Sequence, residues 1–243
     1  MDQLVIAHGR RGSALQIDFD PIRFHTVAIP DDISLVVAYS GTPGAKGAEA
    51  RDGYNTRVVA SRAAAACLAA RLGLDAGEPP ALSKVAGAVT GDLLASLPSE
   101  ASVADLMVEF RIDAGPVATL TTETYDLLRP FPVQSVATHI LSEASRVDAT
   151  ERALVAGDAA RVGALMNESH ASLRSFGVSS PGLERVTAAM RSAGALGARI
   201  TGAGFGGNAV AACGPDRVAA VIAAAIDATG GPAFEVVASD GLS

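Results

Sequence analysis

Short runs of strand-forming residues open the chain, and a longer helical spacing follows them. Residues 13–18, 24–29 and 33–39 are separated by Asp-Pro and Pro-Asp-Asp sequences, which predicts three strands joined by turns. After a loop rich in Gly and Ala, residues 55–72 contain strong helix formers with small apolar side chains along one face. The chain is therefore expected to begin with a sheet and to continue into a helix.

Three further helices are predicted in the middle of the chain. Apolar side chains recur at helical spacing over residues 133–154, which is typical of a long amphipathic helix. A second helix follows residues 157–158, and a third begins at Ser180 as the N-cap, with Pro181 at its first position. Residues 73–132 are the least readable part of the chain: they contain a short helix-like sequence at residues 90–97 and a predicted helix at about residues 103–110. Their role is left open, and no chemistry is assigned to them.

The C-terminal part of the chain has a compact pattern of strands. Residues 198–201, 208–213 and 234–239 are strand-like, a glycine cluster separates the first two, and residues 215–228 have helical character. With the strand at residues 33–39, the order is strand, helix, strand, strand, helix, strand, with extra helices inserted after the first helix. This order is the ferredoxin-like split βαβ arrangement, so the predicted fold class is α+β.

Composition and charge narrow the class of protein. Of 243 residues, 49% are hydrophobic and 19% are charged, which excludes an intrinsically disordered chain. The longest apolar run, residues 218–226, is far shorter than the roughly 18 residues that a membrane-spanning helix needs. A net charge of -7 argues against nucleic acid as the main partner. Because residues 4–7 are the only apolar run near the start and follow Asp2, no secretory signal is predicted, and we expect a cytoplasmic protein.

The positions of lysine, cysteine and histidine exclude several kinds of site. Neither Lys46 nor Lys84 lies in a G-x-x-x-x-G-K-[ST] sequence, so no P-loop nucleotide site is expected. Cys67 and Cys213 lie in alanine-rich and strand-like sequence, and both are interpreted as small buried side chains. No His or Cys has partners at metal-ligand spacing, so no metal ligand is predicted. His170 lies at the apolar edge of its helix and is interpreted as an interior histidine.

The densest motif is GAGFGG at residues 202–207, which we name the glycine loop. Gly202, Gly204, Gly206 and Gly207 permit positive φ angles and the close approach of another group, as loops that cradle phosphates require. A flexible turn between two strands explains the same glycines, and spacing alone does not choose between the two interpretations. The dinucleotide-binding fingerprint is excluded, because a strand rather than a helix follows the loop.

Asp2 and Tyr54 have little meaning when each is taken alone. Asp2 precedes Gln3 near the start of the chain, where a solvated carboxylate is the simplest interpretation. Tyr54 lies where the Gly-rich loop enters the predicted helix, a common place for a side chain that faces a ligand, although packing explains it as well.

Four sequences, in the same order and at similar intervals, resemble the motifs of one family. MDQ at residues 1–3 resembles G-I-M-D-Q, and GYNTR at residues 53–57 resembles E-Y-N-x-R-R. LMNESHASLR at residues 165–174 resembles L-M-x-E-S-H-x-S-L-R, and GARITGAGFGG at residues 197–207 resembles G-x-R-M-T-G-G-G-F-G-G. The motifs are those of the GHMP small-molecule kinases, and the resemblance is closest to the galactokinases. It extends over nearly the whole chain.

The resemblance implies ATP-dependent phosphorylation of galactose to galactose 1-phosphate, with ATP and Mg2+ as cofactors. By the motif match, Asp2 would accept the proton of the sugar hydroxyl, Tyr54 would hydrogen-bond the sugar, and the glycine loop would lie near the phosphates. The 243 residues contain neither the family's sugar-binding sequence R-x-N-L-I-G-E-H-x-D-Y nor its phosphate loop P-x-G-x-G-L-S-S-S-A. The main ligands of ATP and Mg2+ are therefore expected outside this chain.

The resemblance also implies a domain organisation. Residues 1–40 are expected to be a remnant of the N-terminal domain, and residues 41–243 are expected to be the GHMP kinase C-terminal domain. We therefore expect an N-terminally truncated kinase with little or no activity alone. The alternative from another class is a non-catalytic sugar-binding or regulatory remnant, and a third is an inert fragment that needs a partner chain to fold.

Three departures from the family motifs bear on the substrate. Gly53 and Val58 stand where the motif has Glu and its second Arg, and residues 175–179 stand where the galactokinases have D-D-Y-E-V-S. A kinase for a related sugar is therefore an alternative.

Overall fold

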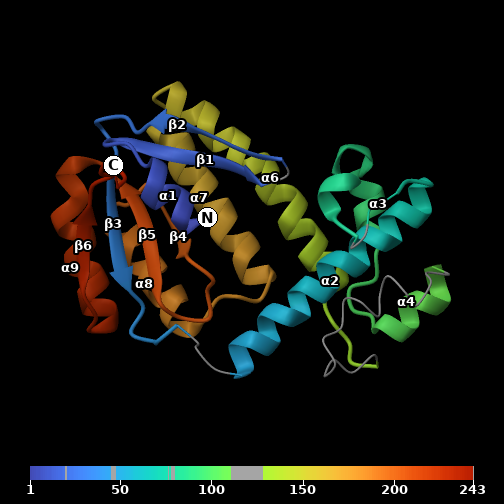
Figure 1. Ribbon diagram of the computed structural model, residues 1–243. Helices are drawn as coiled ribbons and strands as arrows, with labels where there is room; N and C mark the ends of the chain where they lie inside the picture. The colour runs from blue at the N-terminus through green and yellow to red at the C-terminus, as the bar shows by residue number, and fades with distance from the viewer. Residues whose placement is uncertain (20, 45–47, 76, 78–79, 111–127, 243) are drawn as a thin grey trace. The chain divides into compact units, whose positions relative to one another are not determined.

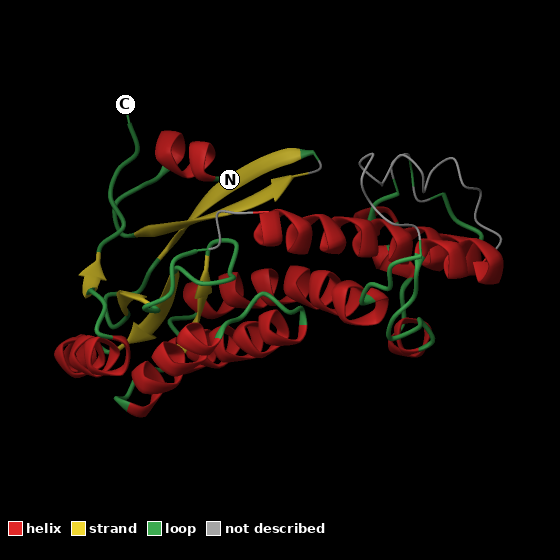
Figure 2. Cartoon of the chain, turned by 90° about the horizontal axis from the view of Figure 1, so that it is seen from below, coloured by secondary structure: helices red, strands yellow, loops and turns green. Residues whose placement is uncertain are grey.

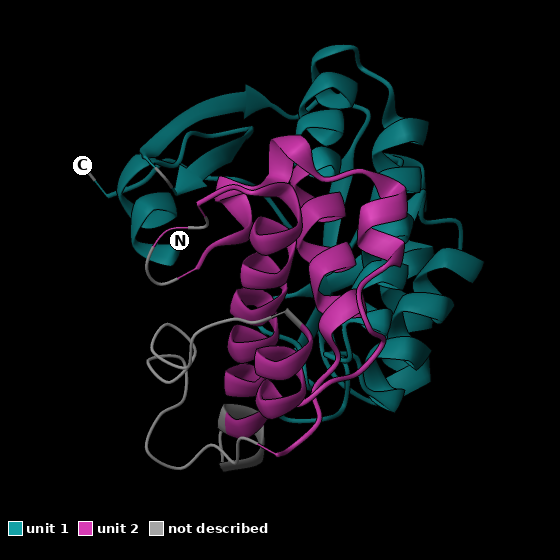
Figure 3. Ribbon diagram, turned by 90° about the vertical axis from the view of Figure 1, so that its right-hand side faces the viewer, with its two compact units in different colours: residues 1–45, 145–243 teal, residues 46–144 magenta. Residues whose placement is uncertain are grey.

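The structure is a computed structural model that describes residues 1–19, 21–44, 48–75, 77, 80–110 and 128–242. The chain divides into two compact units, shown in Figure 3. Unit 1 contains residues 1–45 and 145–243, and unit 2 contains residues 46–144. Each unit is described by itself.

Unit 1 contains a four-stranded antiparallel sheet (Figure 1). Its strands are β3 (Ser34–Tyr39), β4 (Gly197–Thr201), β5 (Asn208–Cys213) and β6 (Ala233–Val236), in the spatial order β4-β5-β3-β6. This order is that of the split βαβ arrangement, so the predicted α+β fold class is confirmed. The last strand is shorter than the predicted residues 234–239, because β6 ends where its pairing with β3 ends.

Two helices cover one face of the sheet. These are α8 (Pro181–Ser192), which contacts β4 and β5, and α9 (Val218–Thr229), which follows the short 3-10 turn η3 (Pro215–Arg217) and contacts β3 and β6. The sequence predicted that the first helix covers the sheet and that the inserted helices follow it. The helix that packs beside α9 on the sheet is instead α8, the last helix before β4. The helix predicted at residues 55–72 belongs to unit 2 instead.

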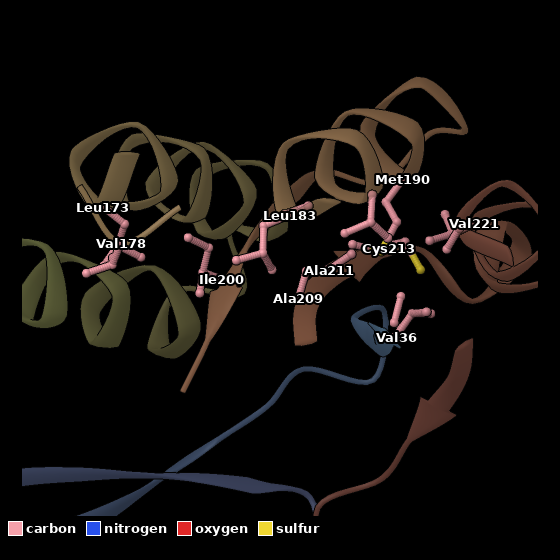
Figure 4. Close-up of a cluster of buried hydrophobic side chains, with 14 residues drawn as sticks. Val36, Leu173, Val178, Leu183, Met190, Ile200, Ala209, Ala211, Cys213 and Val221 are labelled. Carbon is pink, nitrogen blue, oxygen red and sulfur yellow. The ribbon is translucent and has the colours of Figure 1, made fainter. Parts of the chain in front are cut away.

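The core of unit 1 lies between these helices and the sheet. Figure 4 shows Leu183 and Met190 of α8 pointing toward the strands, where Ile200, Ala211 and Cys213 face them. Burying each large side chain of this kind contributes about 1.5–3 kcal/mol. On the opposite face, Ala212 contacts a second cluster made with α6 (Val133–Val155) and α7 (Ala159–Ser175), because neighbouring strand residues point to opposite faces. The other buried members of the second cluster are Ile33, Ala153, Val162 and Leu165.

A separate hairpin opens unit 1 (Figure 2). Strands β1 (Ser13–Phe19) and β2 (Ile22–Ala28) pair antiparallel, and the short helix α1 (Asp2–His8), which the sequence did not predict, precedes them. The C-terminal residues hold α1, since the Leu242 amide donates to the Ile6 carbonyl over 2.8 Å and the Gly241 amide donates to the Gly9 carbonyl over 2.9 Å.

Unit 2 is helical in its described part. It contains α2 (Ala48–Leu72), the 3-10 turns η1 (Leu82–Lys84) and η2 (Ala86–Ala88), the helices α3 (Gly91–Ala95) and α4 (Val103–Phe110), and the first half of α6. The poorly patterned stretch of residues 73–132 thus holds short helical turns, and its residues 111–127 lie outside the described part.

Both cysteines are buried, as predicted. Cys67 of α2 and Cys213 of β5 are each fully buried. Burial raises the pKa of the Cys67 thiol to about 12, so it is not a nucleophile at neutral pH. Among the described residues, no helix combines the length and the apolar character that crossing a membrane would require.

Candidate functional site

The glycine loop connects β4 to β5 and adopts a backbone that ordinary residues avoid. Its positive φ angles are 79° at Gly202, 81° at Gly204, 122° at Gly206 and 78° at Gly207. Phe205 also has a positive φ of 59°, which is unfavourable for a side chain of its size and persists only where the surroundings impose it. The loop is thus a specific conformation that packing maintains.

Two of the loop glycines are required by close contacts within the chain. A Cβ atom on Gly204 would lie 2.8 Å from the Cβ of Val178, and a Cβ atom on Gly206 would lie 2.9 Å from the carbonyl oxygen of Thr42. Such separations do not occur between real atoms, so only glycine fits. At Gly202, by contrast, a Cβ atom would meet no described atom within 4 Å. Within the loop, Gly202 is therefore the position with open space beside it.

Hydrogen bonds clamp the glycine loop from two sides. On one side the Phe205 amide donates to the Val178 carbonyl over 2.7 Å. On the other side the Gly207 amide donates to the Thr42 carbonyl over 2.8 Å, and the Ser40 amide donates to the Gly207 carbonyl over 2.9 Å. The amides of Phe205 and Gly207 are thus used by the fold, so a phosphate could be met only by the other amides of the loop.

The helix α7, which carries the LMNESHASLR motif, packs against β4 and β5 of the sheet. His170 is 3% exposed, and its Nε2 lies 3.3 Å from Glu184 Oε1 and 3.2 Å from Thr187 Oγ1 on α8. Burial lowers the pKa of His170, and the nearby Glu184 carboxylate opposes this only in part. The prediction of an interior histidine is confirmed by this burial.

Asn167 in the same motif binds the edge strand β4. Its Oδ1 accepts a hydrogen bond from the Ala198 amide over 3.1 Å, and its Nδ2 donates to the Leu196 carbonyl over 3.2 Å. Where α7 crosses β4, Gly163 and Gly197 lie backbone to backbone. Sequence reasoning could not single out Asn167 or Gly163, because their partners lie about thirty residues away in the chain.

Tyr54 belongs to unit 2, near the start of α2, and its side chain is 63% exposed. Side chains of the same motif fold back on the helix, because Thr56 Oγ1 donates to the Asp52 carbonyl over 2.8 Å and Arg57 Nη1 donates to the Gly53 carbonyl over 2.7 Å. Burial lowers the pKa of the Arg57 guanidinium. Tyr54 is therefore an exposed side chain on a well-bonded helical turn.

A two-pronged ion pair fixes the same helical turn. Arg129 Nη1 and Nη2 lie 2.8 Å from Asp52 Oδ1 and Oδ2 respectively. The hydrogen bond from Arg129 is the largest cause of the lowered pKa of Asp52. Two parallel bonds define the geometry of both side chains. Sequence reasoning missed this pair, since 77 residues separate its members and no motif links them.

Asp2 lies at the start of α1 in unit 1 and is exposed. The same helix ends in His8, whose ring stacks on Phe24 of β2 at a centroid distance of 4.4 Å. Asp2 and the glycine loop thus share unit 1, held by different partners, while Tyr54 belongs to unit 2. A hollow lined by Ser34, Leu35, Glu235 and Val236, among others, contains none of these three sites.

The residues described do not make a complete site for Mg2+. Across the described ranges, no group of three or more His, Cys, Asp or Glu side chains is arranged to hold a metal ion. Among the predicted site residues, Asp2 alone has a carboxylate, the kind of oxygen ligand that Mg2+ prefers.

Comparison with known proteins places these features in a family. Residues 150–231 match the family described as GHMP kinases C terminal. The chain is 33% identical over 229 residues to the galactokinase of Chloroflexus aurantiacus, an alignment that covers 93% of this chain and 49% of that protein. It is 34% identical over 212 residues to the galactokinase of Roseiflexus sp., covering 86% of this chain and 44% of that protein. The chain thus spans about half the length of the curated relatives it matches.

A solved structure gives the same relationship. The crystal structure of Lactococcus lactis galactokinase complexed with galactose is 25% identical, has a TM-score of 0.66, and is matched over 98% of this chain and 53% of that one. Residues 150–231 of the chain therefore match the GHMP kinases C-terminal domain, and the chain is similar to galactokinases over most of its length, as its motifs predict.

Proposed function

We propose that these 243 residues form part of a galactokinase-type sugar kinase that transfers the γ-phosphoryl group of ATP to galactose. The observation that carries the proposal is the collinear similarity to galactokinases over 93% of the chain. Asp2, Tyr54 and the glycine loop all lie within the sequences that resemble the family's motifs. We further propose that residues 1–40 contribute to the N-terminal domain of the kinase and residues 41–243 to its C-terminal domain, and that the kinase acts in the cytoplasm.

The proposed chemistry assigns one role to each predicted residue. The anomeric oxygen of galactose forms a bond to the γ-phosphorus while the bond from that phosphorus to the bridging oxygen of ADP breaks. The sugar hydroxyl proton passes to the Asp2 carboxylate, and Tyr54 orients the sugar through a hydrogen bond. The glycine loop supports the phosphate side of the site. Gly202 is the loop position best suited to face a ligand, because a Cβ atom there would have no described atom within 4 Å.

A coupled ADP-release assay tests the activity. The 243 residues alone are expected to show little or no turnover with galactose, because they contain no family phosphate loop. Joined to the complementary part of the Chloroflexus aurantiacus galactokinase, they are expected to release ADP in the presence of galactose. In that chimera Asp2→Asn should remove most of the activity, since general base catalysis contributes typically 10²–10⁴-fold.

The matched control is Asp18→Asn, which changes an exposed aspartate of β1 in the same way. Equal activity of the Asp2→Asn and parent chimeras would contradict the role of Asp2. Turnover of the 243 residues alone at the rate of a galactokinase would contradict their predicted inactivity. A preference for another sugar would instead support the related-sugar alternative, which residues 175–179 motivate because they differ from the galactokinase D-D-Y-E-V-S sequence.

A second candidate function is a non-catalytic sugar-binding or regulatory module. It is motivated by the retention of Asp2 and Tyr54 in a sequence that contains no phosphate loop. Calorimetry separates the two functions. Binding of galactose without binding of ATP–Mg2+ by these 243 residues, together with an inactive chimera, would favour the module.

A further inference from the structure

A buried histidine lies at the centre of a hydrogen-bond network that leads to the glycine loop. Thr187 Oγ1 donates its proton within α8, to the Leu183 carbonyl over 2.8 Å, so its lone pairs are left to face His170. His170 Nε2 is therefore the donor toward Thr187 and Glu184. Its Nδ1 is buried and has no hydrogen-bond partner among the described residues, which fits a neutral ring with an unused acceptor.

Glu184 links His170 to Ser179 through contacts of its carboxylate. Its Oε1 accepts a hydrogen bond from Ser179 Oγ over 2.5 Å, and its Oε2 lies 3.4 Å from Arg174 Nη1. Ser179 directly follows Val178, whose carbonyl receives the Phe205 amide. Besides Glu184, the charged groups that act on His170 are Arg174 of α7 and Arg191 of α8. The network thus connects two helices to one side of the clamp around the glycine loop.

We propose that His170 is a positioning residue for the glycine loop. His170 Nε2 restrains the Glu184 carboxylate, and that carboxylate restrains Ser179 through a hydrogen bond. Ser179 in turn positions the neighbouring Val178 carbonyl, which accepts the hydrogen bond from the Phe205 amide. The left-handed backbone of Phe205 depends on that anchor, because a side chain of its size leaves this conformation when the restraint is removed. The value of this positioning for phosphoryl transfer rests on the proposed function, whereas the positioning itself does not.

The two-sided clamp supplies an internal reference for a test. The Phe205 amide reports on the side that His170 controls, and the Gly207 amide reports on the side made by Thr42. A local opening exposes only the amides it frees, whereas global unfolding exposes both. The ratio of the two exchange rates therefore separates positioning from general stability.

The experiment is amide hydrogen exchange, followed by NMR, on the 243-residue chain. His170→Phe keeps a ring without a donor, His170→Asn places its amide near the Nδ1 position, and His170→Gln places a donor near the Nε2 position. Relative to Gly207, the Phe and Asn variants are expected to speed exchange at Phe205 by about tenfold, as the loss of one buried hydrogen bond allows. The Gln variant is expected to return most of the protection.

Two further variants keep the test decisive if a His170 variant fails to fold. Ser179→Ala and Glu184→Leu remove a hydrogen-bonding group at later steps of the network and should give the same selective change at Phe205. Glu168→Leu is the matched control, since Glu168, like His170, is on α7 but pairs with Arg161 at an exposed position. Equal acceleration at Phe205 and Gly207, or no acceleration at either, would overturn the proposal. An inactive kinase chimera would leave this result untouched, so the two proposals fail separately.

Discussion

Gly197 shows how a residue in a kinase motif can serve the fold alone. It is part of GARITGAGFGG, but its Cα faces the backbone of Gly163, where α7 crosses β4. A Cβ atom at Gly197 would overlap the Gly163 carbonyl group, and both partners are main chain, which cannot rotate away. The motif therefore combines residues for a helix–strand crossing with residues for a loop.

Gly197→Ala is expected to destabilise the protein by about 3 kcal/mol, at the upper end of the usual cost of overpacking, because α7 and β4 must separate. Urea denaturation at pH 7.5 measures the change in the free energy of unfolding. Gly87→Ala is the control, since a Cβ atom there meets no described atom within 4 Å, and it should change stability little. A Gly197→Ala protein as stable as the parent would show that the crossing is not tight.

The His170–Glu184 pair predicts that stability falls in acid. Burial holds the pKa of His170 below its unfolded value of about 6.5, so the folded state binds fewer protons than the unfolded state. The stabilisation is complete above that unfolded value and decreases as the pH falls toward the folded one. For Glu184, burial raises the pKa, but the hydrogen bonds from Ser179 and His170 and the charge of Arg174 outweigh it, which adds a loss of stability at lower pH.

Urea denaturation at pH 7.5 and pH 5.5 tests this prediction. The parent is expected to lose unfolding free energy between the two values, and His170→Gln, which cannot titrate, should lose less. A slope that is the same in both proteins would assign the acid sensitivity to other groups.

At the scale of elements, α7 closes the outer edge of the sheet at β4. An exposed edge strand offers unpaired backbone groups to other chains, and proteins usually cover such edges. Asn167 does this here with one side chain that accepts from Ala198 and donates to Leu196. Its amide thus takes the place of a neighbouring strand over part of the edge.

A graded series of substitutions tests that capping. Asn167→Leu removes both bonds and should cost about 1–3 kcal/mol, because backbone groups of β4 lose their partners. Asn167→Asp keeps the acceptor for Ala198 but loses the donor to Leu196, so an intermediate loss is expected from thermal or urea unfolding. Equal stability of the Asp and Leu variants would mean that only the donor matters.

Apart from α1, the order of the main elements could be predicted from the sequence, but the partners of each element could not. The ferredoxin-like topology was predicted from the succession of strands and helices. The signals for these elements are local: short hydrophobic runs indicate the strands, and Ser180 and Pro181 mark the start of α8. The sheet-covering helix is α8 rather than the helix at residues 55–72, a choice made by long-range packing that spacing does not reveal.

The candidate site, like the fold, could be predicted from the sequence only in part. The positive φ angles of the glycine loop were predictable from its composition. The neighbours that require Gly204 and Gly206, namely Val178 and residues 42–43, were not, because a sequence does not state which backbone lies beside which. The pairing of Asp52 with Arg129 was unpredictable for the same reason.

At the scale of the whole molecule, the hairpin of β1 and β2 is sparsely covered. Phe19 and Ile22 pair at its tip and are 59% and 64% exposed, while Val27 is the buried residue of β2. One contact with the rest of unit 1 is the 2.8 Å bond between His25 Nε2 and Glu151 Oε1. Apolar side chains on a two-stranded ribbon of this kind favour association with another surface.

We therefore expect the 243-residue chain to associate as its concentration rises. Sedimentation velocity at several concentrations should show this, and replacing Phe19 by Ser together with Ile22 by Thr should reduce it. Val108→Thr is the control, because Val108 is more exposed but lies on α4 in unit 2. A parent chain that stays monomeric at all concentrations would contradict the expectation.

The contact between the two ends of unit 1 has a practical consequence. Residues 241 and 242 bond to residues 9 and 6 of the N-terminal segment, the helix of which begins with Asp2. A purification tag attached after the last residue would therefore emerge close to α1, and one attached before Met1 would lie close to Asp2 in the sequence. Ligand-binding measurements that involve Asp2 are best made on protein from which tags at both ends have been cleaved.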